Sequence, residues 1–260
     1  MSARRMSLLP LILAAASCAP REAAVAPGME IAVSGGTTLD YVWQDGDTWR
    51  FLAWAILDSE NGEGYEAIAL TSGFMPDQAP ATGSIVTLPL DPSMRDALED
   101  RLASARLVRE ATGQHGAGHE EESEASLREA ITADPGWSVP RYDLALLLIG
   151  RMDAGSARAV LEPVSGKPRA ALLLGLMAWE EGDVMAARAR LEAAVAAEYP
   201  PAEALASAAI AYMVTGEDYL AGRLWTRLLQ DASAPSELRL MAVRFCLGMY
   251  EPLPPGFDGL

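Results

Sequence analysis

Two groups of residues have the types and spacing that metal binding or acid–base catalysis requires. In the first, His115 and His119 are four residues apart and are followed by Glu120, Glu121 and Glu122. Two imidazoles and a carboxylate can bind a transition metal when a helix places them on one face. The surrounding sequence, GQHGAGHEEE, contains glycines that disfavour a helix. We therefore expect a solvated turn here and no metal site.

The second group is Asp45 and Asp47, because paired carboxylates can hydrolyse a glycosidic bond. Both lie in the tight turn QDGD, residues 44–47, where capping the backbone is the simpler role. A nucleophile would need a neighbouring base, and both histidines of the chain lie in one glycine-rich segment. Lys167 has no phosphate-binding loop before it. We predict that the protein is not an enzyme and binds no cofactor; a cell-wall hydrolase is the weakest alternative.

The N-terminus has the order of a secretory signal. Arg4 and Arg5 precede an apolar run, Leu8–Ala16, that is too short to span a bilayer, and small residues lead to Cys18. The sequence AASC resembles the lipobox of bacterial lipoproteins, although Ala15 stands where that family usually has Leu. Ordinary secretion and an uncleaved anchor are the alternatives.

The lipoprotein resemblance implies that residues 1–17 are a signal peptide and that Cys18 carries lipid. Ala19, rather than an Asp, follows the cysteine, which in that family favours the outer membrane, facing the periplasm. Cys246 then has no cysteine partner, and its apolar surroundings predict a small buried side chain.

The charge of the chain restricts its partners. The 260 residues have a net charge of −16, and removing residues 1–17 leaves 18 basic residues against 36 acidic ones. Binding to nucleic acid needs clustered cations, so we expect none. An acidic surface also binds anionic lipid poorly, so membrane attachment should come from lipid on Cys18.

The mature chain divides into regions of different hydrophobic periodicity. Residues 18–38 mix Ala, Pro, Gly and Ser, as flexible tethers do. Residues 39–90 alternate strand and helix patterns, whereas residues 94–249 have helical spacing throughout, and residues 250–260 form a tail. The predicted fold class is a small α+β domain followed by an all-α solenoid.

In the α+β region the predicted order is strand, helix, helix, strand, over Leu39–Trp43, a helix from Trp49, Tyr65–Gly73 and Ser84–Leu90. Asp47 or Thr48 can cap the first helix. This order, with YVWQDGDTW, YEAIALTSG and GSIVTLP, resembles the LysM domain, of which Gly-Asp-Thr is the most characteristic triplet. Ser72 stands where that family usually has Asn.

The LysM resemblance implies binding of glycans that contain N-acetylglucosamine, such as peptidoglycan, between the loop after the first strand and the loop before the last. The implied binding residues are Gly46, Asp47, Thr48, Trp49, Ser72, Gly73, Phe74 and Met75. Aromatic faces and a few fixed polar groups are what a sugar site needs. In the alternative, Asp47 and Thr48 only cap the helix, and Trp49 and Trp54 only fill a small core.

One pattern of small residues recurs in the helical region. Gly175 is followed by Ala187, Leu191 and Ala194, and the same steps start at Ala111, Ala145 and Ala209. Small side chains let antiparallel helices approach closely, while large apolar ones fill the flanking space. Turns are expected within residues 150–155, 180–183 and 215–218, and prolines 135, 200 and 235 end the second helices.

This spacing, with AITADP at residues 130–135, resembles tetratricopeptide repeats, in about four helix pairs. The first copy departs from the family in a long turn, Thr112–Glu124, and Pro163 shortens the second helix of the second copy. An unrelated helical bundle is the alternative.

The repeat resemblance implies that first helices line a concave groove, which would contain Tyr142, Leu146, Ile149, Leu172, Leu176, Trp179, Ile210 and Met213. Such an apolar face favours an amphipathic helix or hydrophobic segment of a protein partner. In the alternative, the closing helix, Ser236–Leu247, or the N-terminal domain already covers part of it.

Together these features predict a non-catalytic envelope lipoprotein. Its LysM-like domain would bind peptidoglycan and its repeats a protein partner, so that it acts as an anchor or assembly factor. In the alternative, it is a protein–protein scaffold whose LysM-like domain is degenerate and purely structural.

Overall fold

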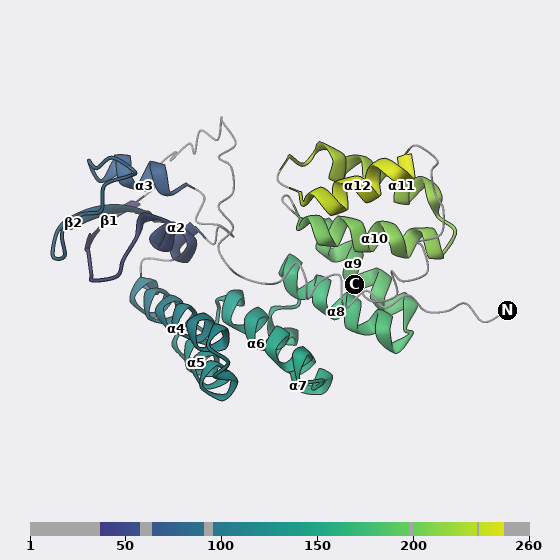
Figure 1. Ribbon diagram of the computed structural model, residues 1–260, viewed down its shortest axis with the longest axis horizontal. Coiled ribbons are helices and arrows are strands. Elements are labelled where there is room, and N and C mark those ends of the chain that lie inside the picture. The colour runs from purple at the N-terminus through teal and green to yellow at the C-terminus, as the bar shows by residue number, and fades with distance from the viewer. Residues whose placement is uncertain (1–36, 58–63, 91–95, 198–199, 233, 247–260) are drawn as a thin grey trace. The chain divides into compact units, whose positions relative to one another are not determined.

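The computed structural model describes residues 37–57, 64–90, 96–197, 200–232 and 234–246. The predicted signal peptide, the lipidation residue Cys18, most of the tether and the C-terminal tail lie outside these residues. The described part contains a two-stranded antiparallel sheet and eleven α-helices (Figure 1). Among the described residues, no helix combines the length and the hydropathy of a membrane-spanning segment. Contacts divide the chain into two compact units, with the division between Pro140 and Arg141.

The first unit begins with the predicted order of strand, helix, helix and strand, which we call the N-terminal module. Its elements are β1 (Thr37–Val42), α2 (Trp49–Leu57), α3 (Tyr65–Thr71) and β2 (Ile85–Leu90). A helix pair follows, α4 (Leu98–Gly116) and α5 (Glu120–Ala133). The predicted α+β start and helical remainder are thus confirmed.

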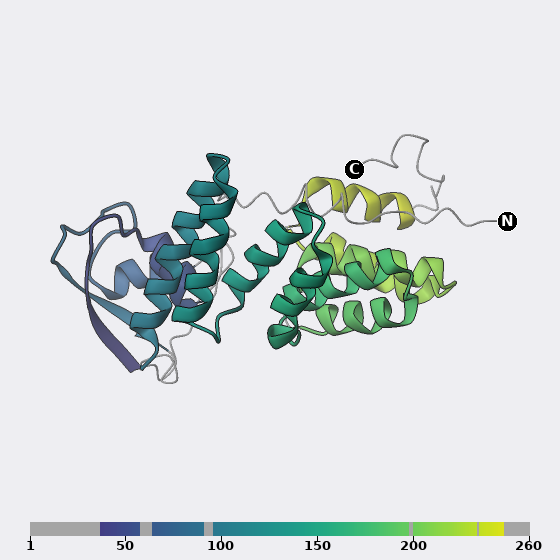
Figure 2. The ribbon, with the colours of Figure 1, turned by 90° about the horizontal axis from the view of Figure 1, so that it is seen from below.

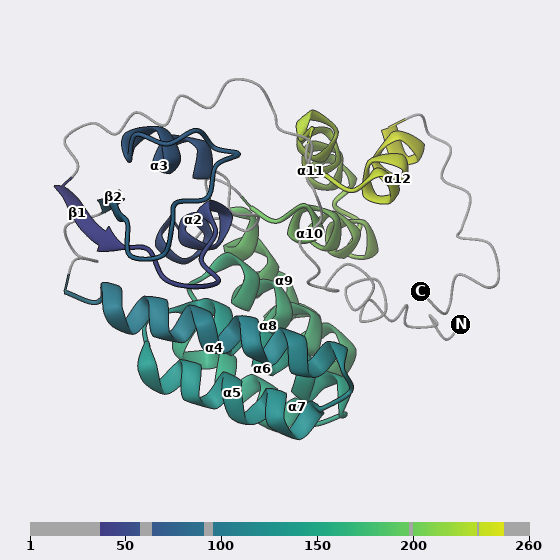
Figure 3. The same cartoon turned by 60° about the vertical axis from the view of Figure 1, so that its left-hand side comes forward.

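The sheet of the module pairs β1 with β2 in an antiparallel register, from Thr37 opposite Leu90 to Val42 opposite Ile85. Because strand side chains alternate between faces, Tyr41 and Val86 turn inward and are buried, while Val42 and Ile85 are exposed. Helix α2 is apolar on most of its surface and is almost entirely buried. It lies between α3 and α4 (Figure 3), which explains why so few of its positions are polar.

Helices α4 and α5 lie side by side in the same compact unit as the module (Figure 2). Arg101 of α4 joins three parts of this unit. It donates a hydrogen bond of 3.2 Å to the Ala55 carbonyl, forms an ion pair with Asp134 and stacks on Trp137 at 5.0 Å. The composition change near residues 89–94 is therefore a change of secondary structure inside one unit.

The long turn expected over Thr112–Glu124 is wrong, because α4 continues to Gly116 and α5 starts at Glu120. Glycine costs about 1 kcal/mol in a helix interior. Packing offsets that cost here, since Ala111 and Ser123 are buried and the Ser123 hydroxyl donates to the Ala111 carbonyl at 2.9 Å. The glycines near His115 therefore do not end the helix where the sequence suggested.

The second unit contains the remaining helices. They are α6 (Ser138–Gly150), α7 (Ala154–Leu161), the short 3₁₀ helix η2 (Glu162–Val164), α8 (Pro168–Glu181), α9 (Val184–Val195), α10 (Ala202–Val214), α11 (Asp218–Gln230) and α12 (Ser236–Cys246). The unit division falls in the first turn of α6. Helix α8 packs on α9, α10 packs on α11, and α12 packs on both α11 and α10. The turns fall within the predicted segments, and α7 ends just before Pro163 as expected.

Every residue of the recurring small-residue pattern is buried: Ala111, Ser123, Leu127, Ala130, Ala145, Ala157, Leu161, Val164, Gly175, Ala187, Leu191, Ala194, Ala209, Ala221, Trp225 and Leu228. The closest approach is at Gly175. A Cβ there would lie 3.0 Å from Leu191 Cγ and 3.2 Å from the Ala187 carbonyl oxygen. The pattern therefore marks where the helices touch.

The prediction that Cys246 is buried is wrong, because its side chain is exposed. Leu238 and Ala242 are the buried residues of α12. Cys246 is the last residue of this helix and lies beyond them, so the apolar composition of its neighbours does not place it in the core.

Candidate functional site

The Gly46-Asp47-Thr48 turn connects β1 to α2, and its aspartate is buried. The Asp47 carboxylate accepts hydrogen bonds from the Tyr41 hydroxyl at 2.6 Å and from the Gln44 backbone NH at 2.9 Å. Burial, followed by the hydrogen bond to Asp47, raises the pKa of Tyr41 far above its usual value. The buried Asp47 side chain therefore stabilises the turn by binding the end of β1 and the first residue of the turn.

Thr48 is the residue that caps α2. Its hydroxyl oxygen accepts a hydrogen bond of 3.1 Å from the Phe51 NH, which the first turn of a helix would otherwise leave unpaired. Of the two cap residues that the sequence allowed, Thr48 caps the helix. Asp47 instead accepts hydrogen bonds within the turn.

Two arginines of α4 bind the same turn from outside the module. Arg106 Nη2 lies 2.8 Å from the Tyr41 hydroxyl and 3.5 Å from Asp47 Oδ1. Arg109 donates a hydrogen bond of 2.8 Å to the Gly46 carbonyl, and its guanidinium stacks on Phe51 at 4.5 Å. Sequence reasoning missed both arginines. They lie about sixty residues after the turn, and no local pattern connects the two segments.

The loop before β2 approaches the turn through Trp49. The buried Trp49 indole donates to the Gln78 carbonyl at 2.7 Å, and its ring lies 5.8 Å from that of Phe74. Phe74 is partly exposed, and Met75 beside it is 56% exposed. The structure thus brings together the two loops named from the sequence, with an apolar surface at Phe74 and Met75.

Ser72 connects α3 to the last strand. Its hydroxyl oxygen accepts a hydrogen bond of 3.0 Å from the Thr87 NH and lies 2.9 Å from both the Thr87 and the Ile68 carbonyls. The single hydroxyl proton can be donated to either carbonyl. The polar side chains of the predicted glycan site, Asp47, Thr48 and Ser72, thus all have partners within the protein.

The apolar groove predicted along the first helices is only partly exposed. Leu172 and Leu176 are buried, and so is Tyr142. Leu146, Ile149, Trp179, Ile210 and Met213 are partly exposed. Because α8 is apolar on all sides, its leucines pack inside the unit and do not form an open face.

At the end of that predicted groove, the closing helix takes part in covering the surface. Ile210 and Met213 pack against a core cluster that includes Leu238 and Ala242 of α12. These two residues thus pack on the same core as α12, and the alternative in which the last helix covers part of the first helices stays a prediction.

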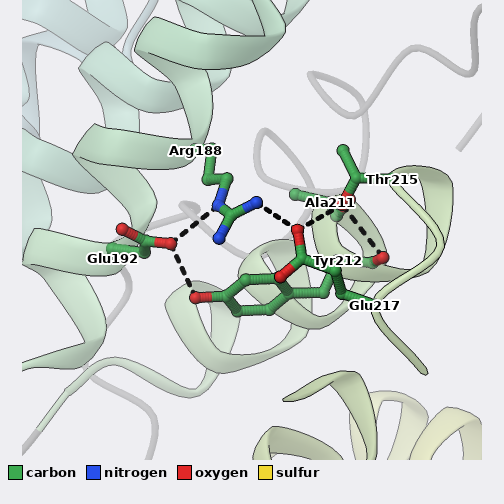
Figure 4. A network of polar contacts seen from close by, with 6 residues as sticks. All are labelled: Arg188, Glu192, Ala211, Tyr212, Thr215 and Glu217. Atoms are coloured by element: carbon green, nitrogen blue, oxygen red, sulfur yellow. Dashed lines mark hydrogen bonds and ion pairs between the residues drawn. The ribbon is translucent and has the colours of Figure 1, made fainter. Parts of the chain in front are cut away.

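A polar network joins α9 to α10 and to the turn before α11 (Figure 4). Arg188 forms ion pairs with Glu192, at 2.8 Å, and with Glu217. The Tyr212 hydroxyl donates to Glu192 at 2.7 Å, and the Arg188 guanidinium lies over the Tyr212 ring. The hydrogen bonds from Arg188 and Tyr212 lower the pKa of Glu192, while burial raises the pKa of Tyr212 to about 12. The network fixes one helix pair against the next.

The histidines do not form a metal site in the described part of the chain. His115 lies in the last turn of α4, His119 precedes α5, and both are exposed. No group of three or more His, Cys, Asp or Glu residues among the described residues is arranged to hold a metal ion.

In comparisons with known proteins, no family model matches the chain and no curated protein matches it significantly.

Proposed function

We propose that the protein is a non-catalytic envelope lipoprotein, attached through Cys18, whose LysM-like module binds peptidoglycan and whose tetratricopeptide-like helix pairs bind a protein partner. The observation that carries the glycan half is the meeting of the two module loops at Trp49. Phe74 packs on its ring, and Met75 is exposed beside it.

An apolar surface between two fixed loops suits a sugar, because a pyranose ring has apolar faces rimmed by hydroxyls. The loops are held rigidly by the Trp49–Gln78 hydrogen bond and by Ser72 on Thr87. A site that is already ordered loses little entropy on binding. This favours Phe74 and Met75 as the ligand-contacting residues of the eight, with Asp47, Thr48 and Ser72 as the residues that shape the site.

The scaffold alternative also has an observation in its favour. The Gly46 carbonyl at one end of the predicted glycan site accepts a hydrogen bond from Arg109, so this end is already covered by a side chain of α4. In this alternative the module serves only to complete the first compact unit.

A hydrolase is disfavoured by the position of Asp47. Its side chain is buried and bound to Tyr41 and Arg106, so it does not reach a glycosidic bond. The proposal therefore includes no catalytic step.

Sedimentation with purified peptidoglycan tests the glycan half, using residues 19–260 as a soluble protein. We expect the wild type to co-sediment and the double variant Phe74→Ala/Met75→Ser to remain in the supernatant. Leu70→Ser, at an exposed apolar position of α3, is the matched control and should co-sediment like the wild type. Failure of the wild type to co-sediment, or equal sedimentation of all three proteins, would favour the scaffold.

A further inference from the structure

Three exposed large apolar side chains of the second unit lie in or beside the turns that join α6 to α7, α8 to α9 and α10 to α11. Met152, in the turn between α6 and α7, is 94% exposed. Met185, in the first turn of α9, is 74% exposed, and Tyr219, in the first turn of α11, is 78% exposed. A single exposed apolar residue is ordinary, but a group of them marks an interaction surface.

Two ion pairs connect the second helix of one pair to the turn of the next pair. Arg158 of α7 binds Glu181, the last residue of α8, at 2.6 Å. In the next pair, Arg188 of α9 binds Glu217 in the turn between α10 and α11 (Figure 4). Each arginine directly follows the small residue of the recurring pattern in its helix, Ala157 or Ala187. The same contact thus joins α7 to the end of α8, and α9 to the turn between α10 and α11.

The backbone at Met152 adds an independent observation. Helices α6, α8 and α10 each end with two backbone hydrogen bonds. This pair of bonds requires that the residue after the helix adopt a left-handed backbone conformation, with a positive φ. Gly182 and Gly216 take this position in the second and third turns, at φ values of 82° and 80°. Met152 takes it in the first, at φ 61°, and is the one non-glycine residue with a positive φ in the described part of the chain. Met152 thus has a side chain at a position where glycine would be less strained.

Acidic side chains accompany the apolar ones. Asp153, Asp183 and Asp218 are each within two residues of Met152, Met185 or Tyr219, and all three are exposed. Asp153 caps α7 and Asp183 caps α9 through hydrogen bonds of 3.0 Å from Ser156 NH and Ala186 NH. Hydrogen bonding by the side chain and then the backbone NH of Ser156 lowers the pKa of Asp153.

The charges of these turns do not cancel. Glu181 and Glu217 are matched by Arg158 and Arg188, and Arg151 also lies in the first turn. Counted by residue type, the turns and the ion pairs beside them contain three arginines, Arg151, Arg158 and Arg188, and six acidic residues, so they have a surplus of negative charge. The acidic residues are Asp153, Asp183, Asp218, Glu180, Glu181 and Glu217. A binding partner should therefore carry positive charge beside its apolar side chains.

We propose that this turn edge, defined by Met152, Met185 and Tyr219 with Asp153, Asp183 and Asp218, binds a basic amphipathic helix of a partner protein. The apolar face of such a helix covers the exposed side chains, and its Lys or Arg residues meet the aspartates. This inference rests on the proposed role of the helix pairs in binding a protein partner, and it places that partner outside the groove expected from the sequence.

A designed peptide tests the edge directly. The probe is an 18-residue amphipathic helix of Leu and Lys with a fluorescent label, and the control peptide has Glu in place of Lys. We expect residues 19–260 to bind the Lys peptide, and the Glu peptide to bind at least tenfold more weakly. The double variant Met185→Ser/Tyr219→Ser should also weaken binding of the Lys peptide about tenfold, whereas Leu240→Ser, at an exposed position of α12, should leave it unchanged.

Unchanged binding in the double variant, or equal binding of both peptides, would overturn the proposal. The charge requirement has its own variant, Asp153→Asn/Asp183→Asn, because Asn keeps both helix caps while removing two charges. This variant should bind the Lys peptide several-fold more weakly at low salt, and its binding should depend less on salt. If the variant binds the Lys peptide as the wild type does, the inference that the partner is basic is wrong.

Two further measurements separate the alternatives. Flotation with vesicles of phosphatidylglycerol and phosphatidylcholine that is lost in the Met185→Ser/Tyr219→Ser variant would assign the edge to a lipid surface and overturn the proposal. Peptidoglycan sedimentation of the same variant should equal that of the wild type, because neither residue lies in the first unit. Failure of the glycan proposal and failure of the turn-edge proposal are thus distinguishable.

Discussion

Arg109 of α4 donates a hydrogen bond of 2.8 Å to the backbone carbonyl of Gly46, in the turn between β1 and α2. This contact connects the most distinctive triplet of the N-terminal module to a helix that the sequence assigns to the repeats. With Arg106 on Tyr41 and Asp47, it makes the turn a junction within one compact unit. The candidate glycan surface therefore depends on a helix outside residues 39–90.

Asp47→Ala should destabilise the protein more than Thr48→Ala. Removing the carboxylate leaves the buried Tyr41 hydroxyl and the Gln44 NH without their acceptor, which should lower the free energy of unfolding by about 2–3 kcal/mol. Removing the Thr48 cap should cost about 1 kcal/mol. Urea denaturation followed by tryptophan fluorescence measures both. Equal losses would show that the carboxylate does not stabilise the turn in this way.

Gly175→Ala should destabilise the second unit although alanine favours helices. The new methyl group would meet Leu191 Cγ at 3.0 Å and the Ala187 carbonyl oxygen at 3.2 Å, which we expect to cost about 1–3 kcal/mol by overpacking. Gly222→Ala is the control. It lies inside α11 and meets only Phe245, at an ordinary 3.6 Å, so it should stabilise by up to about 1 kcal/mol. Thermal denaturation of the two variants should shift in opposite directions.

Met152→Gly should raise stability and weaken binding at the turn edge. Met152 has a positive φ, which strains a residue with a side chain by about 1 kcal/mol, and glycine removes this strain. The same change removes the most exposed apolar side chain of the turn edge. The reverse change, Gly182→Ala, should destabilise by a similar amount because this residue has a φ of 82°. Calorimetry measures the stability and peptide titration the binding. A Met152→Gly protein that is less stable than the wild type would contradict the strain argument.

Asp143 should make the second unit less stable as the pH rises through the weakly acidic range. Asp143 is partly buried, and the resulting desolvation raises its pKa from 3.8 to about 6, while the charge of Arg169 opposes this rise. Between these values the folded protein holds a proton that the unfolded chain releases. The free energy of unfolding therefore falls as the pH increases and is level above the folded-state pKa.

Asp143→Asn should remove this dependence. The variant should be more stable than the wild type at pH 7, by no more than about 3 kcal/mol, and should have little advantage at pH 3.5. Denaturant unfolding at several pH values measures the difference. An advantage of equal size at both pH values would mean that burial of the charge is not its cause.

Local sequence patterns predict much of this fold because they depend on neighbouring residues. The period-two alternation of β1, the cap at Thr48 and the end of α7 before Pro163 follow from contacts within a few residues along the chain. The small-residue pattern also succeeds, since a close approach such as that of Gly175 to Leu191 requires small side chains in any pair of adjacent helices.

Predictions that depend on competing local and distant contacts were less successful. The glycines around His115 suggested a turn, but packing of Ala111 against Ser123 keeps α4 helical. Leu172 and Leu176 have the spacing of groove residues, yet they are buried because α8 has neighbours on several sides. Periodicity shows that a helix has an apolar face, but not how much of that face another helix covers.

The order of elements, the positions of most helix ends and the residues at which paired helices touch could be predicted from the sequence, because each follows from backbone preferences and side-chain size. Helix packing, in contrast, determines that Arg109 reaches Gly46, that Arg158 binds Glu181 and that Arg188 binds Glu217. The partners in these contacts lie 63, 23 and 29 residues apart. Long arginine side chains can satisfy many acceptors, so which ones they bind depends on the packing of the helices that carry them.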